Sequence, residues 1–143
     1  MMWTTYDMLV RAVRKPLRTP KFFAWLRHER RALKQADMRA LELLKSNLSP
    51  DQLESYRKFG HFHVVGGETG ARYRIRRGHQ MNVDCLDDKG RPVAHLCFLP
   101  AGRIPLADVM LAQKLALELN ETETVASANV TTAGSLPFEW WME

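Results

Sequence analysis

The spacing of apolar side chains changes twice along the chain. Up to residue 59 they recur every three or four positions, which is typical of amphipathic helices. Between residues 61 and 99 they alternate with polar side chains, which is the period of a β-strand with one buried face. From residue 105 to 120 the helical spacing returns. The pattern predicts an α+β fold in which N-terminal helices precede an antiparallel sheet and one apolar helix packs on that sheet.

The N-terminal region is expected to form three helices, over residues 5–14, 21–46 and 49–59. The second contains neither glycine nor proline, and good helix formers dominate it. At the start of the third, Ser49 fits the N-cap position and Gln52 completes a capping box. Gly60 marks its expected end.

Four short alternating segments are expected to be strands, over residues 61–65, 72–77, 80–86 and 92–99. In the DDKGR link, Gly90 fits the left-handed position of a hairpin turn. Short strands joined by short turns predict a four-stranded antiparallel meander. The GGETGA link lacks the Lys–Ser/Thr ending of a phosphate-binding loop and opens no helix, so we interpret it as a turn.

The helix expected at residues 105–120 is apolar over most of its circumference. Such a helix must be buried on two sides, so we expect it to pack on the sheet and on either the N-terminal helices or another subunit. A polar tail follows and ends in the aromatic segment LPFEWWME. The expected organisation is a basic helical region at 1–59, a sheet-and-helix module at 60–120 and a tail at 121–143.

Alternation also divides the strand side chains between two faces. One face is apolar and predicts the core: Phe62, Val64, Tyr73, Ile75, Val83, Cys85, Leu96 and Phe98. The other face is polar: His61, His63, Arg72, Arg74, Arg76, Asn82, Asp84, His95 and Cys97. A half-exposed antiparallel sheet has such a polar face whether or not it binds anything.

Charge is distributed unevenly over a chain of net charge +5. Residues 1–58 hold 13 Lys and Arg against 6 Asp and Glu, whereas residues 101–143 hold 2 against 6. Three arginines on one strand face lie about 7 Å apart, twice the rise per residue. We therefore expect a non-enzymatic binding protein that contacts nucleic acid or another polyanion. The expected contacts are Arg72, Arg74, Arg76 and Arg77, supported by Arg27, Arg30, Arg31 and Lys34.

A structural subunit of a larger assembly, including a homo-oligomer, is the first alternative. It would use the apolar helix at 105–120 and the aromatic end of the chain, where Phe138, Trp140 and Trp141 are residue types that anchor interfaces. Chain ends rich in aromatic residues are expected to dock on their own chain or on a partner.

A zinc-binding or enzymatic module is the second alternative. His61, His63, His95 and Cys97 form a plausible zinc ligand set only if the sheet closes into a small barrel. A nucleophile built from Cys97 and His95 needs a cleft that a flat strand face does not provide. The sequence therefore favours a protein that is not an enzyme and that has no cofactor.

The sequence contains no apolar run long enough to span a bilayer and no signal peptide. Two cysteines without secretory context predict reduced thiols and a cytoplasmic protein. The N-terminal aromatic residues, set among basic ones, either lie on an anionic membrane surface or pack the first helices on the rest, and packing is the simpler interpretation. These residues are Trp3, Tyr6, Phe22, Phe23, Trp25 and Leu26.

Overall fold

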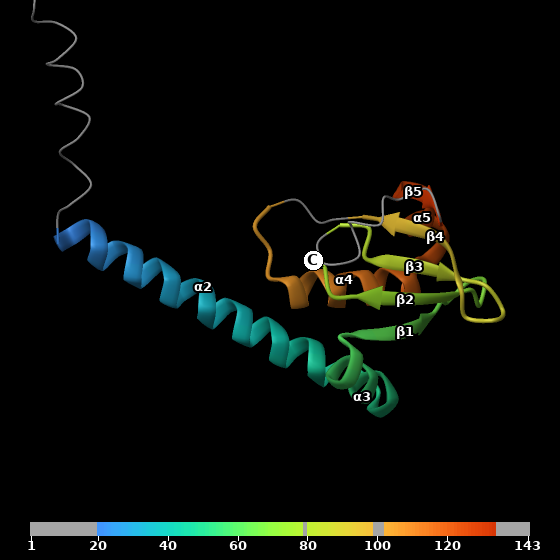
Figure 1. Ribbon diagram of the computed structural model, residues 1–143, viewed down its shortest axis with the longest axis horizontal. Coiled ribbons are helices and arrows are strands. Elements are labelled where there is room, and N and C mark those ends of the chain that lie inside the picture. Colours follow the sequence, from blue (N-terminus) through green and yellow to red (C-terminus); the bar gives the residue numbers. More distant parts are fainter. Residues whose placement is uncertain (1–19, 79, 99–101, 134–143) are drawn as a thin grey trace, which may run out of the picture. The chain divides into compact units, whose positions relative to one another are not determined.

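The computed structural model describes residues 20–78, 80–98 and 102–133 of the chain. The chain divides into two compact units, residues 1–36 and 37–143, and helix α2 (Pro20–Ser46) crosses the division. This division falls inside residues 1–59, which the sequence predicts to be one basic helical region. Residues 37–59 therefore belong with the sheet (Figure 1). The helix expected at residues 5–14 lies outside the described residues.

Helix α2 confirms the helix predicted over residues 21–46. In its second half Ala40 and Leu44 are buried and join the core of the second unit. In its first half, over residues 20–36, every described side chain is exposed except Leu26, which is half-buried. The two halves of one helix therefore have different environments.

Helix α3 (Pro50–Phe59) has the predicted ends. The Ser49 side chain accepts a hydrogen bond from the backbone N–H of Gln52, and the Gln52 side chain accepts one from the backbone N–H of Ser49. The helix ends at Gly60, whose φ of 71° lies in the left-handed region that favours glycine.

The sheet has five antiparallel strands in the order β1-β2-β3-β4-β5, one more than predicted (Figure 1). They are β1 (His61–Val65), β2 (Arg72–Arg76), β3 (Val83–Leu86), β4 (Pro92–Cys97) and β5 (Asn129–Thr132). The expected polar tail thus contains β5 and, before it, helix α5 (Glu121–Ser127). The segment NVTT pairs with β4 in spite of its polar side chains, because β-branched residues suit a strand.

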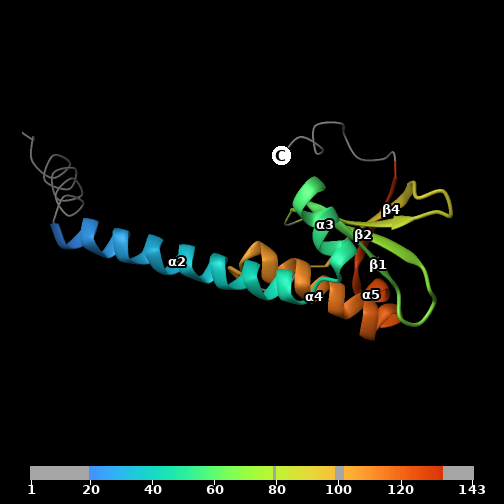
Figure 2. The same cartoon turned by 90° about the horizontal axis from the view of Figure 1, so that it is seen from below.

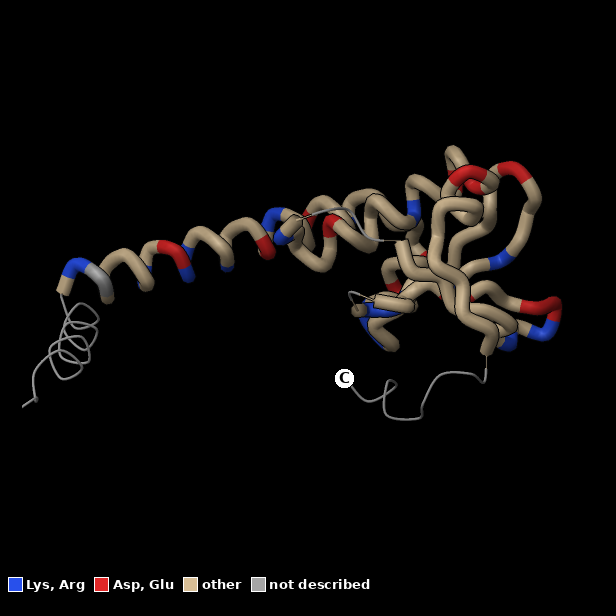
Figure 3. The backbone as a smooth tube through the Cα atoms, turned by 90° about the horizontal axis from the view of Figure 1, so that it is seen from above, with Lys and Arg blue, Asp and Glu red and all other residues tan. Residues whose placement is uncertain are grey.

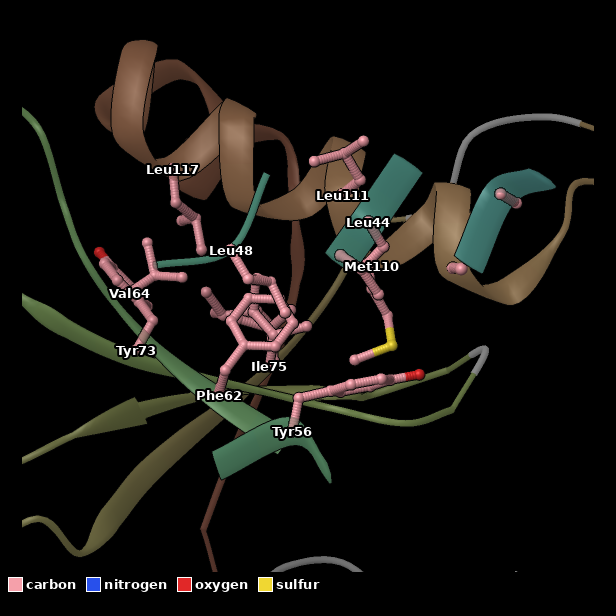
Figure 4. Close-up of a cluster of buried hydrophobic side chains, with 14 residues drawn as sticks. Leu44, Leu48, Tyr56, Phe62, Val64, Tyr73, Ile75, Met110, Leu111 and Leu117 are labelled. Atoms are coloured by element: carbon pink, nitrogen blue, oxygen red, sulfur yellow. The ribbon is translucent and has the colours of Figure 1, made fainter. Parts of the chain in front are cut away.

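The core lies between one face of the sheet and helix α4 (Leu106–Leu119). Phe62, Ile75 and Val83 from the sheet and Met110 and Leu117 from α4 are fully or almost fully buried. Figure 2 shows α4 and α5 with the sheet from below, and Figure 4 shows the buried side chains. The predicted core face is confirmed, although Cys85 and Phe98 are only partly buried.

Strand β3 begins at Val83, three residues later than predicted. Met81 has a φ of 48°, so the chain turns just before the strand and the alternation does not extend back to Asn82. The buried Asn82 side chain exchanges two hydrogen bonds of 2.7 and 2.9 Å with Gln113 of α4. The placement of Asn82 on the polar face was therefore wrong.

Candidate nucleic-acid interface

A row of polar side chains crosses the sheet on the face opposite the core. The strand register places His63 beside Arg74, Arg74 beside Asp84, Asp84 beside His95, and His95 beside Thr131. Neighbours in register share a face. We call this face the outer face.

Asp84 is the acceptor at the centre of the outer face. Nε of Arg74 lies 2.8 Å from its Oδ2, Nε of Arg76 lies 3.0 Å from the same oxygen, and Nδ1 of His95 lies 2.8 Å from Oδ1. Burial raises the pKa of Asp84, but hydrogen bonds and charge from Arg76, together with the hydrogen bonds of His95 and Arg74, lower the pKa overall. The carboxylate is therefore ionised, and it holds two guanidinium groups in fixed positions. We call these four residues the Asp84 cluster.

The side chains of the Asp84 cluster are less exposed than those of a solvated polar face. Asp84 and His95 are fully buried rather than exposed. The side chains of Arg74 and Arg76 remain 23% and 26% exposed. Arg72 is exposed and donates from Nη2 to the backbone oxygen of Asp87 at 2.7 Å.

The predicted arginines of β2 thus lie on one face as expected. Arg77 follows β2 and is also exposed. Two of the four, Arg74 and Arg76, are paired with an acid, which alternation alone did not predict.

Three rings follow the edge of the same face beside these arginines. Phe59 stacks on His61 with ring centres 5.6 Å apart and planes at 21°, and His61 meets His63 edge-on at 5.6 Å. Phe59 is 62% exposed, and Nζ of Lys58 lies 5.5 Å from its ring centre. We call Phe59, His61 and His63 the ring row. Phe59 was not among the predicted contact residues, because it is the last residue of α3 and the strand alternation begins only at His61.

The two histidines of the ring row have lowered pKa values. Burial lowers the pKa of His61, and the charge of Arg74 lowers it further. Burial and then the charges of Arg74 and Arg72 lower the pKa of His63. Both imidazoles are therefore neutral at pH 7, and they offer ring faces to a ligand rather than charges.

The structure does not bring the proposed zinc ligands together. His61 and His63 lie on β1, whereas His95 and Cys97 lie on β4, and β2 and β3 lie between these strands in an open sheet. Three strand spacings correspond to about 14 Å. Among the described residues, no group of three or more His, Cys, Asp and Glu side chains is placed to hold a metal ion.

The glycine-rich link between β1 and β2 does bind an anion, but the anion is a carboxylate of the same chain. The backbone N–H groups of Glu68 and Thr69 donate to Oε2 of Glu121 at 3.0 and 2.7 Å, and the Tyr73 hydroxyl donates to Oε1 at 2.8 Å. A Cβ on Gly67 would lie 1.9 Å from the backbone oxygen of Glu118, so the loop approaches α4 closely because it has no side chain there.

These contacts fix the ionisation of the buried Glu121. Burial raises its pKa, but the hydrogen bonds from Thr69, Tyr73 and Glu68 outweigh burial and lower the pKa to about 2. In return, the Glu68 side chain accepts from the backbone N–H of Thr122 at 3.0 Å. We call Glu68, Thr69, Tyr73 and Glu121 the Glu121 cluster, and it joins the loop to the start of α5.

The other predicted contact residues are distributed differently. Arg27, Arg30, Arg31 and Lys34 are exposed on the first half of α2, where basic positions recur along the helix (Figure 3). Phe138, Trp140 and Trp141 lie outside the described residues. On α4, Leu115 and Leu119 are exposed in the described structure, so the expected burial on two sides does not extend over the whole helix.

No protein-family model, curated protein or solved structure matches the chain. Over the residues that the structure describes, no helix is both long enough and apolar enough to cross a membrane.

Proposed function

We propose that the protein binds single-stranded nucleic acid along β1 and β2 on the outer face. One observation carries the proposal: the ring row lies directly beside the arginines, with His61 in register with Arg76 and His63 in register with Arg74. Single-stranded nucleic acid presents two chemistries side by side, which are phosphates and unpaired bases. Proteins that bind it combine a cationic track with aromatic stacking surfaces.

The arginines supply the cationic track. Arg72, Arg74 and Arg76 against Asp84 leave this part of the outer face with a net charge of +2. A guanidinium has five N–H donors, so Arg74, which is paired with Asp84 through Nε and Nη2, keeps donors on its third nitrogen for a phosphate. Pairing with a buried acid also reduces the side-chain entropy that the arginine loses when a ligand binds.

The ring row supplies the stacking surface. Tyr73, the tyrosine of β2, is buried on the core face and donates its hydroxyl to Glu121, so it is not available for stacking. Phe59, with most of its surface exposed, takes that role instead. In a duplex the bases are paired and stacked on one another, so the ring row favours single strands over duplexes.

Titration of labelled single- and double-stranded DNA and RNA at two salt concentrations tests the proposal. We expect tighter binding of single strands and an affinity that falls as salt rises. No binding at low salt would contradict the proposal. Equal affinity for duplex and single strand would remove the role of the ring row, and binding independent of salt would remove the role of the arginines.

A second candidate function is assembly with other protein chains through α4. The exposed side of this helix carries Ala112, Leu115 and Leu119, and Leu119 is 76% exposed. Sedimentation of the full chain and of a Leu115→Gln/Leu119→Gln variant tests it, because loss of a larger species in the variant is the expected result. If the unsubstituted protein is a monomer, self-assembly through α4 is wrong.

For the compartment we propose the cytoplasm. Cys85 and Cys97 are free thiols on neighbouring strands, which is the usual state of cysteines in a reducing compartment. Localisation of a tagged full-length chain is the direct test.

A further inference from the structure

Residues 20–36 of α2 form an amphipathic helix whose apolar side is not buried. Trp25 and Leu33 are 56% and 46% exposed, and Leu26 is half-buried. Most of the stability of a helix in a protein comes from packing its apolar side against something. This half of α2 therefore has an apolar surface that suits a partner.

The two sides of this helix differ in chemistry. With 100° between successive residues, the apolar side carries Trp25, Leu26, Ala32, Leu33 and Ala36. The opposite side carries the four cations, Arg27, Arg30, Arg31 and Lys34. With Lys21 and the single acid Glu29, residues 20–36 hold five basic groups against one acidic group, a net charge of +4.

We propose that residues 20–36 of α2 bind the surface of a lipid bilayer that contains anionic lipids. Trp25, Leu26 and Leu33 enter the boundary between headgroups and acyl chains, and the arginines and Lys34 contact anionic headgroups. Helices that lie in this interface have Trp, Phe and Leu on one side and Lys and Arg on the other. Clusters of four or more basic residues on such a helix are typical of binding to anionic lipid.

Two other partners fit the helix less well. A nucleic acid would use the cations but would leave Trp25, Leu26 and Leu33 in water. A second copy of α2 would bring two segments of net charge +4 together, and Glu29 would interrupt the apolar contact between them. An anionic bilayer complements both sides of the helix.

Two residues depart from the pattern, and one of them provides a test. Phe23 lies among the cations, and Glu29 lies on the apolar side. A carboxylate at that position opposes entry into the interface and is repelled by anionic lipid. Removing the charge with Glu29→Gln is therefore expected to strengthen vesicle binding by roughly fivefold, whereas the same change at the exposed Glu54 of α3 is expected to have no effect.

Flotation of the full chain with lipid vesicles tests the proposal. One set of vesicles is phosphatidylcholine alone, and the other contains about a quarter phosphatidylserine, near the level that gives a cytoplasmic leaflet its negative potential. The apolar variant is Leu26→Gln/Leu33→Gln, with Ala24→Gln on the polar side as its control. The charge variant is Arg30→Gln/Arg31→Gln, with Arg57→Gln/Arg103→Gln, two exposed arginines of the second unit, as its control. Circular dichroism and urea unfolding establish that each variant is folded, and oligonucleotide binding of each variant is measured in parallel.

We expect flotation with the anionic vesicles only. The apolar variant should no longer float, and the charge variant should partition roughly 25-fold more weakly, while both controls behave as the unsubstituted protein does. Absence of flotation with anionic vesicles at low ionic strength overturns the proposal. Flotation that survives the apolar variant also overturns it. If the α2 variants weaken oligonucleotide binding and leave flotation unchanged, the helix belongs to the nucleic-acid site instead.

Discussion

The carboxylates of Glu121 and Asp84 are both buried, but their hydrogen-bond donors are of different kinds. Glu121 receives its hydrogen bonds from the backbone N–H groups of Glu68 and Thr69 and from the hydroxyls of Thr69 and Tyr73, which are all neutral donors. Asp84 receives its hydrogen bonds from Arg74, Arg76 and the ring of His95. In both cases these partners outweigh burial and lower the pKa.

The difference between the donors separates a structural role from a functional one. The donors to Glu121 belong to a loop and a buried tyrosine, so the carboxylate joins the β1–β2 link to α5. The arginines that bind Asp84 are partly exposed, so this carboxylate fixes charges at the surface. Loss of Glu121 should therefore reduce stability, and loss of Asp84 should also change binding.

The largest expected effect is on stability, from Glu121→Ala. Removing a buried acceptor leaves the donors of Thr69, Tyr73 and Glu68 without a partner, and we expect a loss of about 3 kcal/mol in the free energy of unfolding. Urea unfolding measures it. Glu123→Ala is the matched control, because Glu123 is exposed in the same helix and its side chain accepts a hydrogen bond from the exposed Asn120, so we expect a loss of about 0.5 kcal/mol. Equal losses of unfolding free energy in the two variants would mean that the hydrogen bonds of the Glu121 cluster do not stabilise the fold.

Acid unfolding also tests the contribution of Glu121 to stability. The pKa of Glu121 is about 2 in the folded protein and near the ordinary value of 4.5 in the unfolded chain. Its contribution to stability is therefore complete above pH about 4.5 and is lost as the pH falls from there towards 2. In Glu121→Gln this part of the pH dependence should disappear, as urea midpoints at pH 7 and about pH 3 would show. An unchanged slope would contradict the lowered pKa.

The next effect is that of Asp84→Asn, which should reduce the free energy of unfolding by about 2 kcal/mol, because Arg74 and Arg76 lose their charged partner. The loss is limited because both arginines are partly exposed and recover some solvation. The same change raises the charge of the outer face, so single-stranded oligonucleotides should bind roughly fivefold more tightly at low salt. Urea unfolding and fluorescence anisotropy measure the two effects. Unchanged affinity in a folded variant would separate the Asp84 cluster from the binding site.

Phe59→Ala affects binding alone. We expect about tenfold weaker binding of a single strand, because one stacking surface is lost, and almost no change in stability, because the ring is largely exposed. Val65→Ala is the matched control, since Val65 has the same exposure and lies in β1 beyond the ring row. If the two variants bind alike, bases do not stack on Phe59.

The smallest expected effect is that of pH on affinity. The pKa values of His61 and His63 lie below the ordinary 6.5, so both rings gain a proton only as the pH falls below that value. Each proton adds a positive charge to the outer face, and affinity for a single strand should rise a few-fold between pH 7 and about pH 5. In His61→Gln/His63→Gln the affinity should stay constant over this range. If the affinity still rises at low pH in the variant, protonation of His61 and His63 is not the cause.

Local sequence patterns predicted the fold wherever the order of apolar, polar and turn residues is regular. The capped helix α3, the core face of Phe62, Ile75 and Val83, and the turn at Gly90 (φ 75°) were all predicted from local pattern. Strand β5 was missed because the polar NVTT gains its stability from pairing with β4, which no local pattern shows. The turn at Met81 was missed because a non-glycine residue rarely has a positive φ.

The candidate site was predicted in part. Alternation placed Arg72, Arg74 and Arg76 on one face, as the structure confirms. It gave no indication that Asp84 accepts from two of them while buried, because burial depends on what packs over a strand rather than on the strand itself. Nor did it show that the GGETGA link binds Glu121, a residue 52 positions after Thr69 in the chain.

The most direct test of the nucleic-acid interface is to map it on the isotope-labelled protein by NMR while a single-stranded oligonucleotide is added. We predict that the amide shifts of residues 59–65 and 72–77 change together and saturate with one affinity, and that salt reverses the changes. Shift changes confined to residues 20–36, or no changes at low salt, would contradict the account.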